Sequence, residues 1–180
     1  RQMCIRDSYY YKKTTDLLNT VSLPSSSGYK STVRNIGSIS NQGVELLIEG
    51  DVVQNKDFGL TLQFNIAHNK NRVEELADGK DILGTTYSNY GSGSITIIRE
   101  GEPLGAFYVY KDTGLDENGS LSYEDMNGDG QYTDTEDRYI AGSPFPDFTY
   151  GLNCGIRYKN WDFNFFLQGS QGNDVFNLSL

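Results

Sequence analysis

The stretch that decides the fold is residues 148–168, which read FTYGLNCGIRYKNWDFNFFLQ. Up to the dipeptide Lys159-Asn160 every second residue is apolar, and the same alternation resumes at Trp161. Alternation with a period of two indicates a β-strand with two unlike faces, and a two-residue polar interruption is typical of a tight turn. The sequence therefore predicts two long antiparallel strands joined as a hairpin.

An earlier part of the chain repeats this design. Two alternating runs, 44–52 and 58–66, flank a short turn near Asn55-Lys56-Asp57. Strands are expected near residues 9–18, 43–54, 58–70, 104–113, 147–159 and 161–170. The long, polar segments between the hairpins, rich in glycine, serine, asparagine and aspartate, are 19–42, 69–103 and 112–146. Short turns thus alternate with long loops.

This asymmetry is typical of outer-membrane β-barrels, whose strands of roughly 10 residues alternate apolar-out with polar-in. Six strands are too few to close such a barrel, which needs about 8. The expected fold is therefore all-β, an open fragment of a large antiparallel transmembrane β-barrel with long extracellular loops. The alternative is a secreted, soluble β-sandwich or adhesin module that binds carbohydrate with calcium. The two differ in whether one set of side chains faces outward or is enclosed: Phe148, Tyr150, Leu152, Ile156, Phe163, Phe165 and Leu167.

Composition excludes several classes of protein. The 180 residues include 20 Gly, 13 Tyr and 9 Phe, a composition that favours strands and turns. The longest apolar run is 106–110, far short of the roughly 20 residues of a membrane-spanning helix. A net charge of −9 argues against nucleic-acid partners.

Cys4 and Cys154 stand in unrelated contexts and are expected to be unpaired. With a single histidine, His68, and no paired nucleophile and base, the chain is not expected to be an enzyme.

Five blocks of sequence carry a family resemblance. In chain order they are NIGSISNQGVEL (35–46), GEPLGAFYVYK (101–111), DMNGDG (125–130), YIAGSPFPDFTYG (139–151) and GSQGND (169–174). In order and spacing, residues 9–180 resemble the C-terminal barrel region of SusC/RagA-type TonB-dependent outer-membrane transporters of Bacteroidetes. The resemblance implies a plugged barrel of roughly 22 strands that imports glycan oligomers or peptides. It also implies contact with outer-membrane lipid, energy from TonB through N-terminal parts that are missing here, and a SusD-like lipoprotein over the extracellular mouth.

Residues 1–8 (RQMCIRDS) fit no period and resemble translated adapter sequence. They are expected to be a non-native leader, with 9–180 a partial receptor β-barrel truncated at both ends.

The segment DMNGDGQYTDTE (125–136) matches the calcium-loop pattern D-x-[DN]-x-[DN]-G-x₅-E at every position. Its flanks read as extended, so the hypothesis is a calcium loop without EF-hand helices. The candidate ligands are oxygens of Asp125, Asn127, Asp129, Gln131 and Glu136, with Asp137 as a substitute for Glu136. The alternative is an Asp-Gly turn whose carboxylates accept hydrogen bonds from their own backbone.

Aromatic residues of the long loops are candidate substrate contacts. Tyr87, Tyr90 and Tyr108 are of the type that stacks on sugar rings. The alternative is that they pack the loops against one another.

Overall fold

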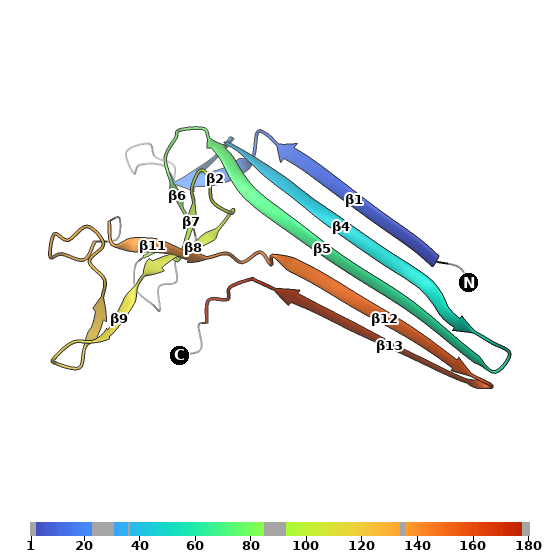
Figure 1. Ribbon diagram of the computed structural model, residues 1–180. Helices are drawn as coiled ribbons and strands as arrows, with labels where there is room; N and C mark the ends of the chain where they lie inside the picture. Colours follow the sequence, from blue (N-terminus) through green and yellow to red (C-terminus); the bar gives the residue numbers. More distant parts are fainter. Residues whose placement is uncertain (1–2, 23–30, 36, 85–92, 134–135, 178–180) are drawn as a thin grey trace. The chain divides into compact units, whose positions relative to one another are not determined.

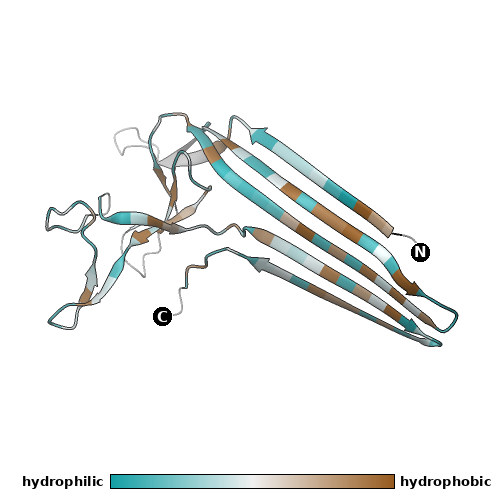
Figure 2. Cartoon of the chain, viewed as in Figure 1, coloured by the Kyte–Doolittle hydropathy of each residue, from teal (hydrophilic) through white to brown (hydrophobic). Residues whose placement is uncertain are grey.

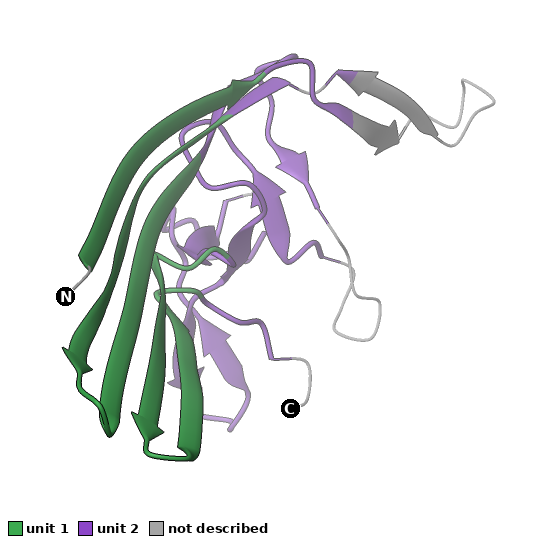
Figure 3. Cartoon of the chain, turned by 90° about the vertical axis from the view of Figure 1, so that its right-hand side faces the viewer, with its two compact units in different colours: residues 1–14, 40–71, 145–173 green, residues 15–39, 72–144, 174–180 purple. Residues whose placement is uncertain are grey.

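The computed structural model describes residues 3–22, 31–35, 37–84, 93–133 and 136–177. The described residues form strands, turns and loops, without a helix. In that part of the chain, no helix has the length and apolar character needed to span a membrane. The chain divides into two units (Figure 3): residues 1–14, 40–71 and 145–173, and residues 15–39, 72–144 and 174–180.

The first unit is built on a five-stranded sheet of order β1-β4-β5-β12-β13 (Figure 1). The strands are β1 (Met3–Thr14), β4 (Gly37–Gln54), β5 (Phe58–Leu76), β12 (Phe148–Tyr158) and β13 (Trp161–Gln171). β12 pairs antiparallel with both β5 and β13. Its 11 residues match the 9–11 residues with which a tilted strand crosses a bilayer.

The register gives the sheet one mainly apolar face and one mainly polar face. Leu152 stands opposite Phe64 on β5 and Leu167 on β13, and one residue later Asn153 stands opposite Gln63. Because the alternating patterns of neighbouring strands are in phase, apolar side chains share one face and polar ones share the other. Figure 2 shows the alternation as stripes along the long strands.

The apolar face of the sheet is exposed. The exposed fractions are 43% for Phe148 and Tyr150, 60% for Phe163 and 59% for Leu167, while Leu152, Ile156 and Phe165 are partly exposed. A β-sandwich would enclose these side chains between two sheets. The soluble-sandwich alternative is therefore wrong.

Aromatic residues gather where the hairpins turn. Tyr158 stands opposite both Phe58 and Trp161, and Trp161 is 78% exposed. Lys159 has a left-handed φ of 52° and its N–H donates to the Asp57 carbonyl at 2.7 Å, which ties the two turns together. Exposed aromatic residues at this level match the girdle of a membrane barrel.

In the second unit, short strands occupy the segments that were predicted to be loops. β6 (Ile82–Leu83), β7 (Thr96–Ile98), β8 (Ala106–Tyr110) and β11 (Arg138–Gly142) form a sheet of order β11-β8-β7-β6. Two separate hairpins pair β2 (Leu18–Ser22) with β3 (Ser31–Asn35) and β9 (Asp112–Leu115) with β10 (Leu121–Tyr123). Ile97, Ala106 and Tyr108 form its buried core, with Ile140 packed against them.

Four strand predictions need correction. The strand predicted at 104–113 is β8 of this second sheet and does not belong to the five-stranded sheet. The strand predicted at 9–18 ends at Thr14, because Asp16 adopts a left-handed φ of 56°, and it begins earlier, at Met3. β4 and β5 run well into the predicted loops, to Gly37 and Leu76. Residues 3–8 continue β1, and their non-native origin stays a prediction.

Candidate functional site

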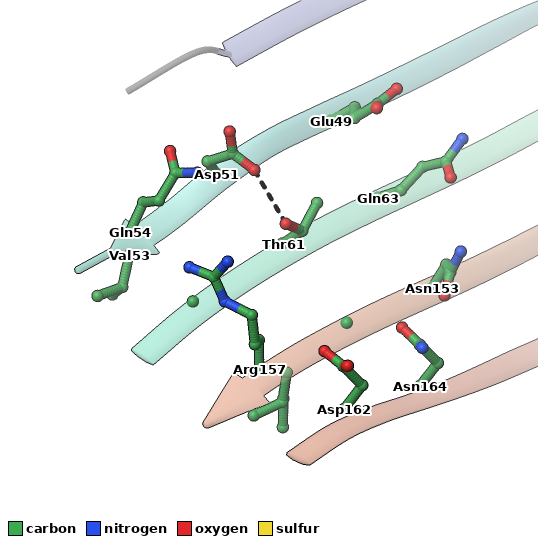
Figure 4. Close-up of a pocket in the computed structure, with 13 residues that line it drawn as sticks. Glu49, Asp51, Val53, Gln54, Thr61, Gln63, Asn153, Arg157, Asp162 and Asn164 are labelled. Atoms are coloured by element: carbon green, nitrogen blue, oxygen red, sulfur yellow. Dashed lines mark hydrogen bonds between the residues drawn. The ribbon is translucent and has the colours of Figure 1, made fainter. Parts of the chain in front are cut away.

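The polar face of the sheet carries a hollow of about 430 Å³ near the hairpin turns (Figure 4). Most of its lining residues alternate along β4, β5, β12 and β13, on the face of the sheet opposite the exposed apolar side chains. The polar side chains that line it are Glu49, Asp51, Gln54, Thr61, Gln63, Asn153, Arg157, Asp162 and Asn164.

Contacts among these side chains are few. The Thr61 hydroxyl donates to Asp51 Oδ1 at 2.9 Å. Arg157 stands opposite Asp162 on β13 and opposite Gly59 on β5. A Cβ added at Gly59 would lie 3.6 Å from the Nε atom of Arg157. Because Thr61, Arg157 and Asp162 are exposed, the hollow is an exposed, charged surface of the sheet and lacks the desolvation of a catalytic pocket.

Farther along the same face, β12 and β13 form a second hollow, of about 500 Å³. Phe166 lies in it and is 59% exposed, although its face of the sheet is mainly polar. The sequence analysis did not single out Phe166, but the alternation that places Asn164 and Gln168 on this face also places Phe166 there.

The predicted calcium loop is held by its own carboxylates. Asp125 accepts hydrogen bonds from the Gly128 N–H at Oδ1 and the Gly130 N–H at Oδ2, both at 2.7 Å. Asp129 Oδ1 accepts from the Gln131 N–H, also at 2.7 Å. The backbone bond from Gly130, with smaller contributions from Gly128 and its neighbours, lowers the pKa of the Asp125 carboxyl.

The residues at the end of the loop differ in role. Asp137 is fully buried and accepts hydrogen bonds from the Met126 N–H at 3.0 Å and the Thr133 N–H at 2.7 Å. Glu136 is exposed and accepts from the Asn127 amide at 3.2 Å. Asp137 therefore ties the two ends of the loop together.

This geometry does not support calcium. Among the described residues, no group of three or more Asp, Glu, His or Cys side chains is placed to hold a metal ion. The hydrogen bonds of Asp125, Asp129 and Asp137 are those of the alternative, an Asp-Gly turn satisfied by its own backbone.

We expect the Gly128 and Gly130 amides to be protected from hydrogen exchange at neutral pH, equally with and without a chelator. Their acceptor, the Asp125 carboxylate, has a pKa below its ordinary value of 3.8, so its stabilisation is complete above that value and is lost as pH falls through the lowered pKa. Asp125→Ala should remove the protection at every pH. Amide exchange followed by NMR or mass spectrometry measures this, and protection that disappears on adding chelator at neutral pH would restore the calcium hypothesis.

The structure describes one of the three aromatic candidates, Tyr108. Tyr87 and Tyr90 lie outside the described residues. Tyr108 is only 3% exposed, and the guanidinium carbons of Arg99 and Arg138 lie 5.3 and 6.0 Å from its ring centroid. Because this ring is enclosed in the core of the second unit, the geometry favours the packing alternative for Tyr108.

Both cysteines are free, as predicted: Cys4 is exposed and Cys154 is 6% exposed. Cys154 lies on the apolar face, opposite Leu62 and Phe165.

Comparison with known proteins finds relatives with the same fold. The chain is 36% identical over 189 residues to TonB-dependent receptor P3 of Formosa agariphila, which covers 96% of the chain and 19% of that receptor. It is 35% identical over 176 residues to TonB-dependent receptor SusC of Bacteroides thetaiotaomicron, which covers 93% of the chain and 17% of SusC. The structure of the RagAB peptide transporter matches 92% of the chain and 18% of that transporter chain, with a TM-score of 0.76 and 25% identity. The chain resembles the SusC/RagA-type TonB-dependent receptors.

This resemblance confirms the fold prediction, an open part of a large antiparallel barrel. The chain spans about a fifth of the length of the curated relatives it matches. No family model matches it. Its relatives are receptors and transporters, not enzymes, as the sequence analysis expected.

Proposed function

We propose that this chain forms part of the barrel wall and extracellular loops of a longer SusC-like outer-membrane transporter. The observation that carries the proposal is the in-register sheet, with one mainly apolar face that is exposed and an opposite face that is mainly polar. A sheet of this kind separates hydrocarbon from a water-filled lumen. SusC- and RagA-type receptors are outer-membrane proteins of Bacteroidetes, and the chain is located in the outer membrane.

In this proposal the second unit belongs to the extracellular loops, because it joins the strand ends opposite the short hairpin turns. The transporter imports glycan oligomers or peptides, receives energy from TonB through segments outside this chain, and works with a SusD-like lipoprotein. The relatives support this assignment: one is a SusC, and another is described as a peptide transporter. Calcium is not part of the proposal, and the metal residues named above stay a prediction.

The topology of the wall is tested with single cysteines. In the full-length receptor with its native cysteines, Cys154 among them, changed to serine, we expect Glu117→Cys, in the exposed β9–β10 turn, to react with a membrane-impermeant maleimide on intact cells. Asn160→Cys, in the two-residue β12–β13 turn, should react only after the outer membrane is permeabilised. Because both positions are exposed, the difference reports the side of the membrane and not burial. Equal labelling of both sites on intact cells would contradict the proposal.

A further inference from the structure

Tyr10 of β1 reaches across β4 and binds β5. β4 lies between these two strands in the sheet, and the Tyr10 hydroxyl donates to Asn69 Oδ1 on β5 at 2.9 Å. Where the phenol crosses β4, that strand carries a buried glycine, Gly43. A Cβ at Gly43 would lie 2.7 Å from the Tyr10 hydroxyl oxygen and would collide with the His68 carbonyl of β5, so only glycine leaves room for the crossing. Gly43 and Asn69 together form a seat for one tyrosine.

A second contact between β1 and β4 gives the same register. The Ser8 hydroxyl donates to Glu45 Oε2 at 3.5 Å. From Ser8 to Tyr10 the chain advances by two residues on β1, while the residue contacted on β4 falls by two, from Glu45 to Gly43. Both contacts therefore belong to one antiparallel register.

Alternation alone leaves this register open to a shift of two residues. A shift of one residue would exchange the faces of β1 and turn Tyr9 and Tyr11, which are 67% and 56% exposed on the apolar face, toward the polar face. A shift of two residues keeps every side chain on its face. In the hairpins of this sheet a short turn excludes such a shift, but residues 15–36 separate β1 from β4. A specific contact is needed to exclude it for β1.

We propose that Tyr10 sets the register of β1 by occupying the seat formed by Gly43 and Asn69. A shift of two residues would place Ser8 or Lys12 over Gly43. Neither side chain has an aromatic ring that covers the glycine together with a hydroxyl that reaches Asn69. This assignment concerns strand pairing within the observed sheet and does not rest on the proposed function.

The test maps the register by disulfide cross-linking in the full-length receptor with its native cysteines changed to serine. The two contacts place Tyr9 beside Val44. Tyr9→Cys is therefore combined with Val44→Cys to detect the observed register, and with Gln42→Cys or Leu46→Cys to detect a shift of two residues. Outer membranes are oxidised, and the linked peptides are quantified by mass spectrometry. With Tyr10 present, we expect the Val44→Cys pair to dominate.

Substitutions at the seat should raise the share of the two shifted pairs. Tyr10→Phe and Asn69→Ala each remove the hydrogen bond, and each should raise this share roughly two- to tenfold, the range for one hydrogen bond. Tyr10→Ala also uncovers Gly43 and should raise the share further. If Tyr10 only stabilised the sheet, these variants would unfold at lower temperature but keep the ratio of linked pairs.

The matched control is Tyr11→Ala, which removes the same type of side chain from the opposite face of β1 and should leave the ratio unchanged. Heat-modified gel mobility shows which variants are folded barrels. A folded Tyr10→Ala receptor with the wild-type ratio would overturn the inference, and so would an equal shift in Tyr11→Ala. If Tyr10→Ala does not fold, unchanged ratios in both Tyr10→Phe and Asn69→Ala would overturn it.

Discussion

Leu152→Arg is expected to prevent accumulation of the folded receptor in the outer membrane. Leu152 lies near the middle of β12, on the apolar face between Phe64 and Leu167. In the proposed barrel this position faces the centre of the hydrocarbon layer, where an arginine on the lipid face of a barrel costs about 2–4 kcal/mol. The measurement is the amount of heat-modifiable receptor in outer-membrane fractions.

The matched control for this substitution is the next residue. Asn153→Arg introduces the same side chain on the opposite face, where Asn153 is exposed beside Gln63 and Phe166. A water-facing arginine has no desolvation penalty, so this variant should accumulate at a level close to wild type. If Asn153→Arg fails and Leu152→Arg assembles, the assignment of the two faces is reversed.

The sequence predicted the wall well because two independent signals agree there. The alternation from Phe148 to Tyr158 sets the strand and its faces, and the two-residue turn at 159–160 fixes the register with β13. Neither signal depends on distant parts of the chain. The hairpin of β4 and β5 was found in the same way.

The second unit was predicted less well, because its strands are only two to five residues long. A run such as Thr96–Ile98 is too short to display a period, and the pairing of β8 with β11 joins segments that are separated by residues 111–137. Tyr108 illustrates the consequence. The sequence suggested Tyr108 as a substrate contact. In the structure its ring lies against Arg99 and Arg138, which are 9 and 30 residues away in the chain.

The 125–137 loop shows what a motif can and cannot predict. The motif left a calcium loop and an Asp-Gly turn as alternatives, and the structure gives a turn in which Gly128 and Gly130 have positive φ, 76° and 78°. The motif did not predict which acid closes the loop, because the choice between Glu136 and Asp137 depends on burial. The structure buries Asp137 and leaves Glu136 in solvent.

Asp137→Ala is therefore expected to loosen the loop by roughly 2–4 kcal/mol. Its carboxylate is the acceptor for the partly buried Met126 and Thr133 N–H groups, and each such donor left without a partner costs about 1–2 kcal/mol, the lower part of the range for a buried donor. Protease cleavage within 125–137 and exchange of the Met126 and Thr133 amides should both accelerate. The wall should keep its protection, because the hydrogen bonds between β12 and its neighbours do not include this loop.

Glu136→Ala separates this account from a metal site. Glu136 occupies the position that closes a calcium shell in the loop pattern, so its removal would weaken a metal-bound loop strongly. In the structure, Glu136 makes only exposed contacts, at 3.2 Å to the Asn127 amide and 3.5 Å to the Thr133 hydroxyl, which contribute within about 0.5 kcal/mol. Cleavage should thus increase for Asp137→Ala and stay near wild type for Glu136→Ala. The account would be wrong if both substitutions loosened the loop equally and if added calcium protected the loop of the wild type but of neither variant. The loop would then be a metal-dependent turn.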